Sequence, residues 1–266
     1  MRVAKIPYLN SQPFYAGLDA TGAAADREGG VDFVEMPPRE LGRLARVGRI
    51  DAGLIPITDA FAVEAQYERL GAFGIAVTGR VESVILVSER PLAALTGARI
   101  GITEDTSASF RLLRLLVEAR EGARPAAYVR GASGSVDAHL LIGDEALAAT
   151  VAGSPAPFTC DLAEEWQEWQ ALPFVFAVWV ARRDLPEEQK VALAARLERS
   201  LSTPDLIPSI AAAYAAGPCA RRSLGTADRL ARYLARFTYR LGPSEEAAIA
   251  RFRALLDEHH IACDTS

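Results

Sequence analysis

The run FVFAVWVAR at residues 174–182 is a long apolar stretch of the kind found in strands that are buried on both faces. A second β-rich stretch, ESVILVS at residues 82–88, lies on the other side of a central block. Their symmetric placement predicts that these stretches are the two crossings between two lobes. We expect residues 1–88 and 183–266 to form lobe one and residues 89–182 to form lobe two, with a ligand cleft between them.

Outward from these crossings, short apolar runs alternate with helical patterns through the first two-thirds of the chain. The expected strands are Arg2–Ile6, Val31–Met36, Asp51–Ile55, Arg99–Ile102 and Ala138–Ile142. Helices are expected from Pro13 and Pro37 and at Ile57–Tyr67, Phe110–Glu118 and Glu145–Val151. Beyond the second crossing only helices are expected, at Glu187–Leu201, Thr203–Ala215, Thr226–Phe237 and Ser244–His259. This alternation is typical of parallel βαβ units and predicts an α/β fold.

The bulk composition fits a globular protein. The 266 residues suffice for one large or two small domains, each with a hydrophobic core. The net charge is −5 and the positive charges are spread along the chain, so a nucleic-acid partner has no electrostatic support. No apolar run approaches the ~20 residues of a membrane span. The N-terminus reaches Pro7 too soon for a signal peptide. We expect a cytoplasmic protein with no membrane partner, and the oligomeric state stays open.

Patterns for metals and cofactors are missing from the sequence. The cysteines Cys160, Cys219 and Cys263 are widely spaced and include no C-x-x-C pair, so reduced thiols are expected. No H-E-x-x-H, G-x-S-x-G, Walker A or G-x-G-x-x-G pattern occurs. We therefore expect neither a metal nor an organic cofactor.

Four loops at strand ends carry small polar residues. Ligands in open α/β sheets bind at the carboxyl ends of strands, so these loops are expected to line the cleft. The first loop holds Asn10 and Ser11. An Asn there either offers a donor and an acceptor to one ligand or caps the helix at Pro13. The second holds Ser83, which either points into the cleft or is an ordinary strand serine.

The third and fourth loops join a strand to a helix. The third spans residues 105–109 and is rich in hydroxyls. Free backbone N–H groups at a helix start favour an anion, and this reading holds alongside simple capping by Thr106 or Ser107. In the fourth loop, Gly143 permits either a tight turn or a close approach to a ligand, and Asp144 is placed to cap the next helix.

Five short motifs occur in order along residues 2–182. They are IPYLNSQPF at 6–14, GRIDAGLIP at 48–56, SV at 83–84, LIGD at 141–144 and LPFVFAVW at 172–179. Each motif alone is unspecific, but the ordered set resembles the futalosine-pathway chorismate dehydratases of menaquinone biosynthesis. The C-terminal helices fit that family in layout.

This resemblance implies a two-lobed, type II periplasmic-binding-protein-like fold that is used as an enzyme. It implies a lyase that removes water from chorismate, a small dicarboxylate, to give 3-[(1-carboxyvinyl)oxy]benzoate. It implies catalytic roles for Asn10 and Ser83. Together with the loops above, it predicts substrate contacts at Ser11, Pro56, Thr106, Ser107, Ser109, Ile142, Gly143 and Asp144. Family members often carry Thr-Ser where this chain has Ala108 and Ser109, which weakens the transfer of contacts at that loop.

The mechanism implied is one without a protein base. The candidate loops hold hydroxyls, amides and backbone N–H groups, and no histidine stands out as a general base. We hypothesise that the substrate's side-chain carboxylate removes the ring proton, while Asn10 and Ser83 hold the reacting geometry. The helix start near residues 106–109 would stabilise the ring carboxylate as charge builds.

Two other functions stay open. One is a non-catalytic protein that binds a small anion, since fold alone does not determine function. The other is the sister dihydroxynaphthoate synthase, whose N-terminal loop usually reads Pro-Cys-Pro-Asn-Asp. This chain reads YLNS at residues 8–11 instead, which favours the dehydratase.

Overall fold

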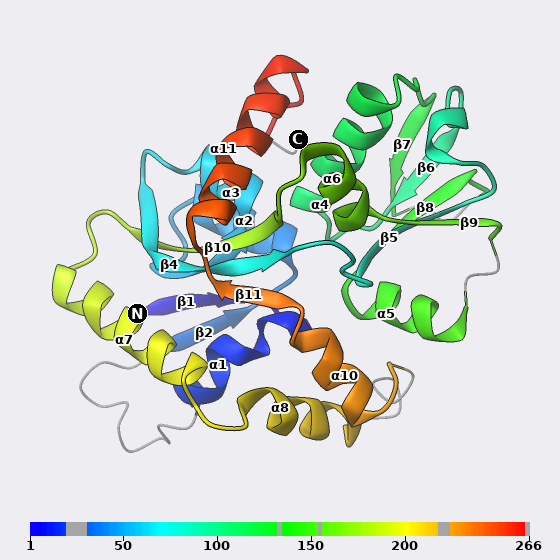
Figure 1. The fold of residues 1–266 in the computed structure, drawn as a ribbon. Helices are drawn as coiled ribbons and strands as arrows, with labels where there is room; N and C mark the ends of the chain where they lie inside the picture. Colours follow the sequence, from blue (N-terminus) through cyan, green and yellow to red (C-terminus); the bar gives the residue numbers. More distant parts are fainter. Residues whose placement is uncertain (20–30, 132–134, 154–155, 218–223, 264–266) are drawn as a thin grey trace.

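The computed structural model of the chain describes residues 1–19, 31–131, 135–153, 156–217 and 224–263. It contains two sheets, which Figure 1 shows side by side with the helix α6 (Leu162–Gln170) between them. Within the described ranges, no helix is both long enough and apolar enough to cross a membrane.

The first sheet has six strands in the order β11-β4-β10-β3-β1-β2. The strands β1, β2 and β3 are parallel, as the alternation of strands and helices predicts. The strands β4, β10 and β11 run antiparallel to their neighbours. The bounds are β1 (Arg2–Lys5), β2 (Asp32–Glu35), β3 (Ala52–Pro56), β4 (Tyr67–Val77), β10 (Phe174–Arg182) and β11 (Phe237–Arg240).

The second sheet has five strands in the order β7-β6-β8-β5-β9. Here β6, β7 and β8 are parallel, and β5 runs antiparallel to both of its neighbours. The bounds are β5 (Val84–Ser88), β6 (Arg99–Ile102), β7 (Ala127–Arg130), β8 (Ala138–Ile142) and β9 (Phe158–Asp161). The edge strands β7 and β9 were not expected, because they are short and half-exposed and their apolar patterns are weak.

The lobe limits expected from the sequence put β5 in lobe one and β10 in lobe two, whereas the sheets place them the other way round. The chain leaves the first sheet after Val77 and returns to it at Phe174. The crossings are therefore the short links at residues 78–83 and 171–173, and the two β-rich stretches are strands beside them. An apolar run that is buried on both faces looks the same in either sheet, so the pattern could not assign it.

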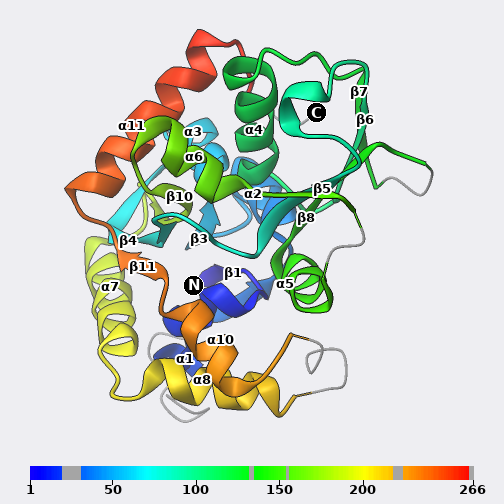
Figure 2. The ribbon, with the colours of Figure 1, turned by 45° about the vertical axis from the view of Figure 1, so that its right-hand side comes forward.

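The helices cover both faces of the first sheet. Figures 1 and 2 show α7, α8 and α10 gathered below that sheet and α11 above it. The α-helical bounds are α1 (Gln12–Asp19), α2 (Pro38–Arg46), α3 (Ile57–Ala62), α4 (Ala108–Arg114), α5 (Gly143–Ala152), α7 (Glu187–Leu201), α8 (Leu206–Ala215), α10 (Ala227–Leu234) and α11 (Pro243–Glu258). Three further turns are η1 (Leu9–Ser11), η2 (Leu92–Ala94) and the π-helical η3 (Leu115–Arg120), which continues α4.

Two expected helices are wrong in part. The helix expected at Ile57–Tyr67 ends at Ala62, because Tyr67 begins β4. The helix expected at Thr226–Phe237 ends at Leu234, and the strand β11 follows it where only helices were expected. This strand exists because Phe237 pairs with Val77 of β4, a contact far away in sequence that local periodicity does not register.

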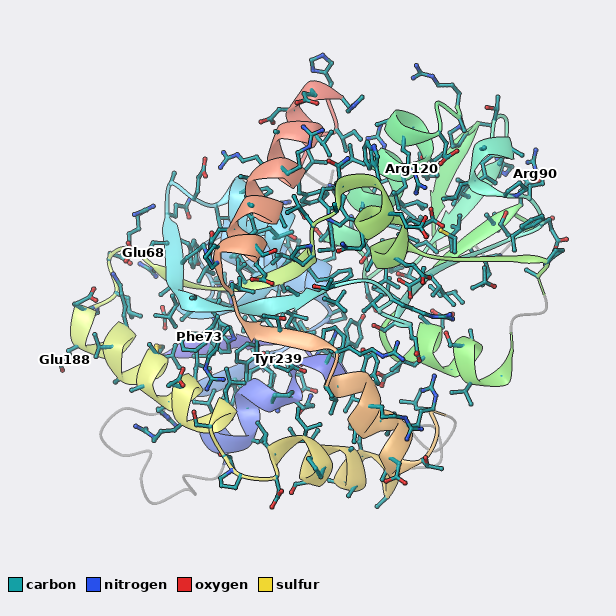
Figure 3. All side chains as sticks on the ribbon, in the orientation of Figure 1. Glu68, Phe73, Arg90, Arg120, Glu188 and Tyr239 are labelled. Atoms are coloured by element: carbon teal, nitrogen blue, oxygen red, sulfur yellow. The ribbon has the colours of Figure 1, made fainter. Side chains whose placement is uncertain are left out.

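Aromatic side chains fasten α1 to the first sheet. Phe14 of α1 is fully buried and meets Phe73 of β4, Tyr239 of β11 and Trp179 of β10, with ring centroids 6.4, 5.5 and 5.6 Å away. Figure 3 labels Phe73 and Tyr239, which lie near one another on adjacent strands. These edge-on contacts hold α1, and hence the loop between β1 and α1, against the sheet.

The carboxylate of Asp161 joins the first crossing to the start of α6. It accepts hydrogen bonds from the backbone N–H groups of Val81 and Glu82 at 3.0 and 2.6 Å. It also caps α6, as expected, by accepting from Ala163 and Glu164 at 3.1 and 3.3 Å. Because Asp161 is 5% exposed, water does not replace these contacts.

Removing this carboxylate is expected to destabilise the protein strongly. Asp161→Ala deletes an N-cap and leaves the two crossing N–H groups without a partner, which predicts a loss of about 2–4 kcal/mol in the free energy of unfolding. Denaturant unfolding followed by circular dichroism measures it. The control is Asp228→Ala, an exposed acid in the first turn of α10, which should change stability by less than about 0.5 kcal/mol. Equal effects of the two substitutions would contradict the role given to Asp161.

Candidate functional site

A cavity of about 70 Å³ lies where the strand ends of both sheets meet. The loops after β1, β3, β6 and β8 and the crossing before β5 all reach it, which is the strand-end position expected for a ligand site. Its polar side chains come from Tyr8, Asn10, Ser83, Asp105, Ser107 and Ser109. Apolar residues of β4 and β10, among them Ile75 and Phe176, form its floor.

Most of the expected site residues converge on this cavity. The lining includes Asn10, Pro56, Ser83, Ser107, Ser109, Ile142 and Gly143. The expected contacts Ser11, Thr106 and Asp144 do not line it. The sequence thus located the loops, whereas the direction of single side chains within a loop depends on the backbone path.

Asn10 and Ser11 are neighbours with opposite roles. Asn10 lies in η1 and lines the cavity, and it does not occupy the position before α1. The Ser11 hydroxyl turns inward and donates to the carbonyl oxygens of Ile6 and Tyr8 at 2.6 and 2.7 Å. Ser11 is fully buried, so it shapes the loop and is not positioned to meet a ligand.

Ser83 is presented to the cavity by a strained backbone. The residue before it, Glu82, has φ of +65°, a conformation that non-glycine residues adopt at a cost of order 1–3 kcal/mol. The Glu82 carboxylate is held by Arg229 and Arg236 of the α10 region at 2.8 and 2.6 Å. The Ser83 carbonyl accepts from the Gly143 N–H at 2.8 Å. The crossing is thereby held from both lobes.

The hydroxyl of Ser83 is left available to a ligand. It is buried and has no hydrogen-bond partner within the described part of the chain. The phenol of Tyr233 on α10 faces it: burial raises the pKa of Tyr233, and its interaction with the Ser83 hydroxyl opposes that rise. Sequence reasoning missed Tyr233, because a tyrosine on a C-terminal helix carries no local sign of a distant serine.

The loop at residues 105–109 divides its hydroxyls between the cavity and the other lobe. Ser109 lines the cavity near the start of α4. The Ser107 hydroxyl also reaches the cavity wall, but it donates to the carboxylate of Asp59 at 2.6 Å and lies 3.1 Å from the Thr58 hydroxyl. No side chain among the described residues caps α4, so the expected capping by Thr106 or Ser107 does not occur. The first N–H groups of α4 remain free for an anion.

Asp59 anchors a buried link between the lobes. Arg46 of α2 donates to its carboxylate at 2.7 Å, and Ser107 donates from the second lobe. Gly42 makes this possible, since a Cβ there would lie 2.3 Å from the carboxyl group. On the same side, Arg111 donates to the carbonyls of Ala262 and Cys263 at 3.2 Å, and burial lowers the pKa of Arg111 to about 10.

The fourth loop also both lines the cavity and forms a contact between the lobes. Gly143 has φ of +59°, and its missing Cβ leaves room for the Tyr8 ring, which such an atom would meet at 3.1 Å. Asp144 does not cap α5, which begins after Ile142. It accepts instead from the Tyr214 hydroxyl of α8 at 2.7 Å, a second contact between the lobes. Asp144 therefore closes the cleft and does not line it.

The charge inside the cavity is unusual for a site that would take an anion. No Lys, Arg or His occurs among the described residues that line it, and Asp105 is an acid. Burial, reinforced by the negative charge of Glu104, raises the pKa of Asp105, and the facing Tyr8 hydroxyl opposes that rise. Burial and the nearby Asp105 likewise raise the pKa of Tyr8. Neither residue was singled out from the sequence as a site residue.

Metal and thiol chemistry find no support in the described residues. No group of three or more His, Cys, Asp or Glu side chains is placed there to hold a metal ion. Burial raises the pKa of the Cys160 thiol, which disfavours the reactive thiolate. Cys219 lies outside the described residues.

Comparison with known proteins gives the same picture from sequence and from fold. A family model described as menaquinone biosynthesis matches residues 1–258. A chorismate dehydratase of Thermus thermophilus is 34% identical over 215 residues, which is 73% of this chain and 76% of that protein. The match to the family model includes the loops that line the cavity, because they lie within residues 1–258.

Solved structures share the two-lobed architecture at low identity. A protein from Archaeoglobus fulgidus superposes with a TM-score of 0.75 at 21% identity, covering 98% of this chain and 97% of the other. The periplasmic aliphatic sulphonate binding protein of Escherichia coli gives a TM-score of 0.59 at 19% identity, over 99% and 88% of the two chains. The fold is therefore periplasmic-binding-protein-like, as expected.

The contact between Ser107 and Asp59 is expected to contribute to stability. Ser107→Ala removes a buried hydrogen bond to a charged group, which predicts a loss of about 1–3 kcal/mol in the free energy of unfolding. The matched control is Ser109→Ala, at a neighbouring cavity hydroxyl, which should cost clearly less. Thermal or denaturant unfolding of both variants tests this, and equal stabilities would show that the link between the lobes carries little free energy.

Proposed function

This chain belongs to the menaquinone biosynthesis family, and from that membership we infer that it is a chorismate dehydratase. The enzyme is a lyase that removes water from chorismate to give 3-[(1-carboxyvinyl)oxy]benzoate. The observation that carries this inference is the 34% identity with the Thermus thermophilus chorismate dehydratase over 73% of this chain. The same similarity favours the dehydratase over a non-catalytic binding protein and over the sister synthase. We propose that the enzyme acts in the cytoplasm on this small dicarboxylate.

The reaction depends more on the correct placement of the reacting groups than on a strong acid or base from the protein. One ring carbon of chorismate loses a proton and the neighbouring carbon loses its hydroxyl group, so that the ring becomes aromatic. Aromatisation supplies the driving force. The protein must hold the side-chain carboxylate near the ring proton and exclude water, since correct placement of reacting groups accounts for large rate factors.

Asn10 and Ser83 are suited to hold the substrate. They come from opposite sides of the cavity, one from η1 and one from the crossing before β5. Among the described residues the Ser83 hydroxyl faces only the Tyr233 phenol, so it is available to bind a substrate oxygen. The described lining contains no His or Lys that could serve as a base. This supports the proposal that the substrate's own side-chain carboxylate removes the proton.

The other expected contacts are proposed as follows. Ser109 and the first N–H groups of α4 would receive the ring carboxylate, whereas Thr106, which does not line the cavity, is given no contact. Pro56, Ile142 and Gly143 would form the walls around the ring. The hydroxyl of Ser107 is committed to Asp59 in this closed arrangement, so its part is to hold the lobes together around the substrate.

Loss of either holding group is expected to slow catalysis strongly. Asn10→Ala and Ser83→Ala should each lower kcat on chorismate by about 100-fold or more, because the reacting carboxylate is no longer held in place. Growth of the aromatic product's absorbance measures turnover. The controls are Gln12→Ala, which alters the same loop outside the cavity, and Ser88→Ala at the far end of β5. Normal turnover by both site variants would refute the assigned roles.

A further inference from the structure

We propose that Asp105 is the acid of the reaction: it enters the cycle protonated, held by Tyr8, and gives its proton to the departing hydroxyl group. This inference rests on the proposed function and adds a proton donor to it. It concerns the leaving group, for which the substrate's own carboxylate is not required.

Asp105 is the lining residue best suited to donate a proton to the leaving group. Among the described lining residues, Asp105 alone has a carboxyl group, and the remaining polar side chains are Tyr8, Asn10 and three serines. Amides and alcohols are too weakly acidic to protonate a leaving group near neutral pH, and burial raises the pKa of Tyr8 further from that range. Hydroxide is a poor leaving group, and a positioned acid typically contributes 10²–10⁴-fold to such a step.

The charge balance of the site favours the protonated form of Asp105. A dicarboxylate enters a cavity whose described lining has no cation and already contains the Asp105 carboxyl group. Two like charges that share a site raise the pKa of one of them. Burial and Glu104 already raise the pKa of Asp105 in the free protein, and the substrate acts in the same direction. Binding of the dianion therefore brings a proton onto Asp105, which converts an electrostatic conflict into a hydrogen-bond donor.

The groups around Asp105 hold it without neutralising it. Tyr8, the residue before η1, faces it, and Glu104 precedes it in the same loop. Arg39 of α2 donates its backbone N–H to the Asp105 carbonyl at 3.2 Å, and its guanidinium lies 4.0 Å from Glu104. Arg130 of β7 is bound to the backbone carbonyls of Thr103, Glu104 and Thr106. The two arginines are thus directed to Glu104 and to backbone oxygens, and the Asp105 carboxyl group is left facing Tyr8.

The step balances with water as the only other product. The substrate's side-chain carboxylate takes the proton from the ring carbon, and that C–H electron pair forms the new ring π bond. The C–O bond on the neighbouring carbon breaks, and the oxygen leaves with the Asp105 proton as water. The carboxylic acid formed on the product then gives up its proton, and Asp105 regains one either directly from the product or from solvent, so the enzyme is regenerated.

The test compares Asp105→Asn with Glu104→Gln, two matched losses of a carboxylate from adjacent positions. Asp105→Asn keeps the side-chain shape and is expected to lower kcat by about 10²–10⁴-fold with little change in KM. In the wild type, kcat should be full below the raised pKa of Asp105, as long as the substrate carboxylate stays ionised, and fall as pH rises through that pKa. That decline should be absent from the Asp105→Asn profile. Glu104→Gln should keep kcat and move the decline to lower pH, because it removes a charge that raises this pKa.

A binding measurement provides a readout besides rate. Titration calorimetry with the product in buffers of different ionisation enthalpy should show uptake of about one proton by the wild type and none by Asp105→Asn. The same titration shows whether the variant is folded and binds. Glu104→Gln remains informative even if Asp105→Asn fails to fold.

The outcomes separate this proposal from the function on which it rests. Wild-type turnover of chorismate together with near-normal kcat in Asp105→Asn would overturn the acid and leave the dehydratase intact. A slow Asp105→Asn variant whose kcat keeps the wild-type decline at high pH would assign that decline to another group and would also overturn the proposal. No turnover by the wild type would overturn the proposed function, and the acid with it.

Discussion

The buried carboxylate of Asp161 is the constraint on which the geometry of the cleft depends. It gathers four backbone N–H groups from two segments about 80 residues apart, the first crossing and the start of α6. Glu82 keeps its left-handed backbone because Asp161 holds its N–H and two arginines hold its side chain. Ser83 follows directly, so its hydroxyl reaches the cavity as a consequence of contacts made elsewhere.

The loops that form the site also close it. Ser107 and Asp144 lie in strand-end loops beside lining residues. Each forms a hydrogen bond with the opposite lobe, Ser107 with Asp59 and Asp144 with Tyr214. In each case the neighbour faces the cavity: Ala108 and Ser109 in one loop, Ile142 and Gly143 in the other. Closure and ligand contact therefore come from neighbouring residues of the same short segments, and Ser107 takes part in both.

Local sequence patterns predicted most strands and the site loops, whereas features that depend on pairing between distant segments were missed. The strands β1, β3, β6 and β8 and the four site loops were placed by alternation and loop chemistry. The sheet membership of β5 and β10, and the existence of β11, depend on partners far along the chain. Asn10 and Ser11 show the same limit at one site, since only the turn of η1 decides which of two polar neighbours faces a ligand. Asp105 escaped notice because an acid is not an obvious partner for a dianion.

The way the two crossings leave the first sheet has a mechanical consequence. β4 ends at Val77 and β10 begins at Phe174, and these residues face each other in the ladder, with Phe237 of β11 on the other side of Val77. Both links to the second lobe are thus attached at a single rung. Any movement of the second lobe relative to the first therefore has to pivot at this rung, because the chain connects the two lobes nowhere else among the described residues.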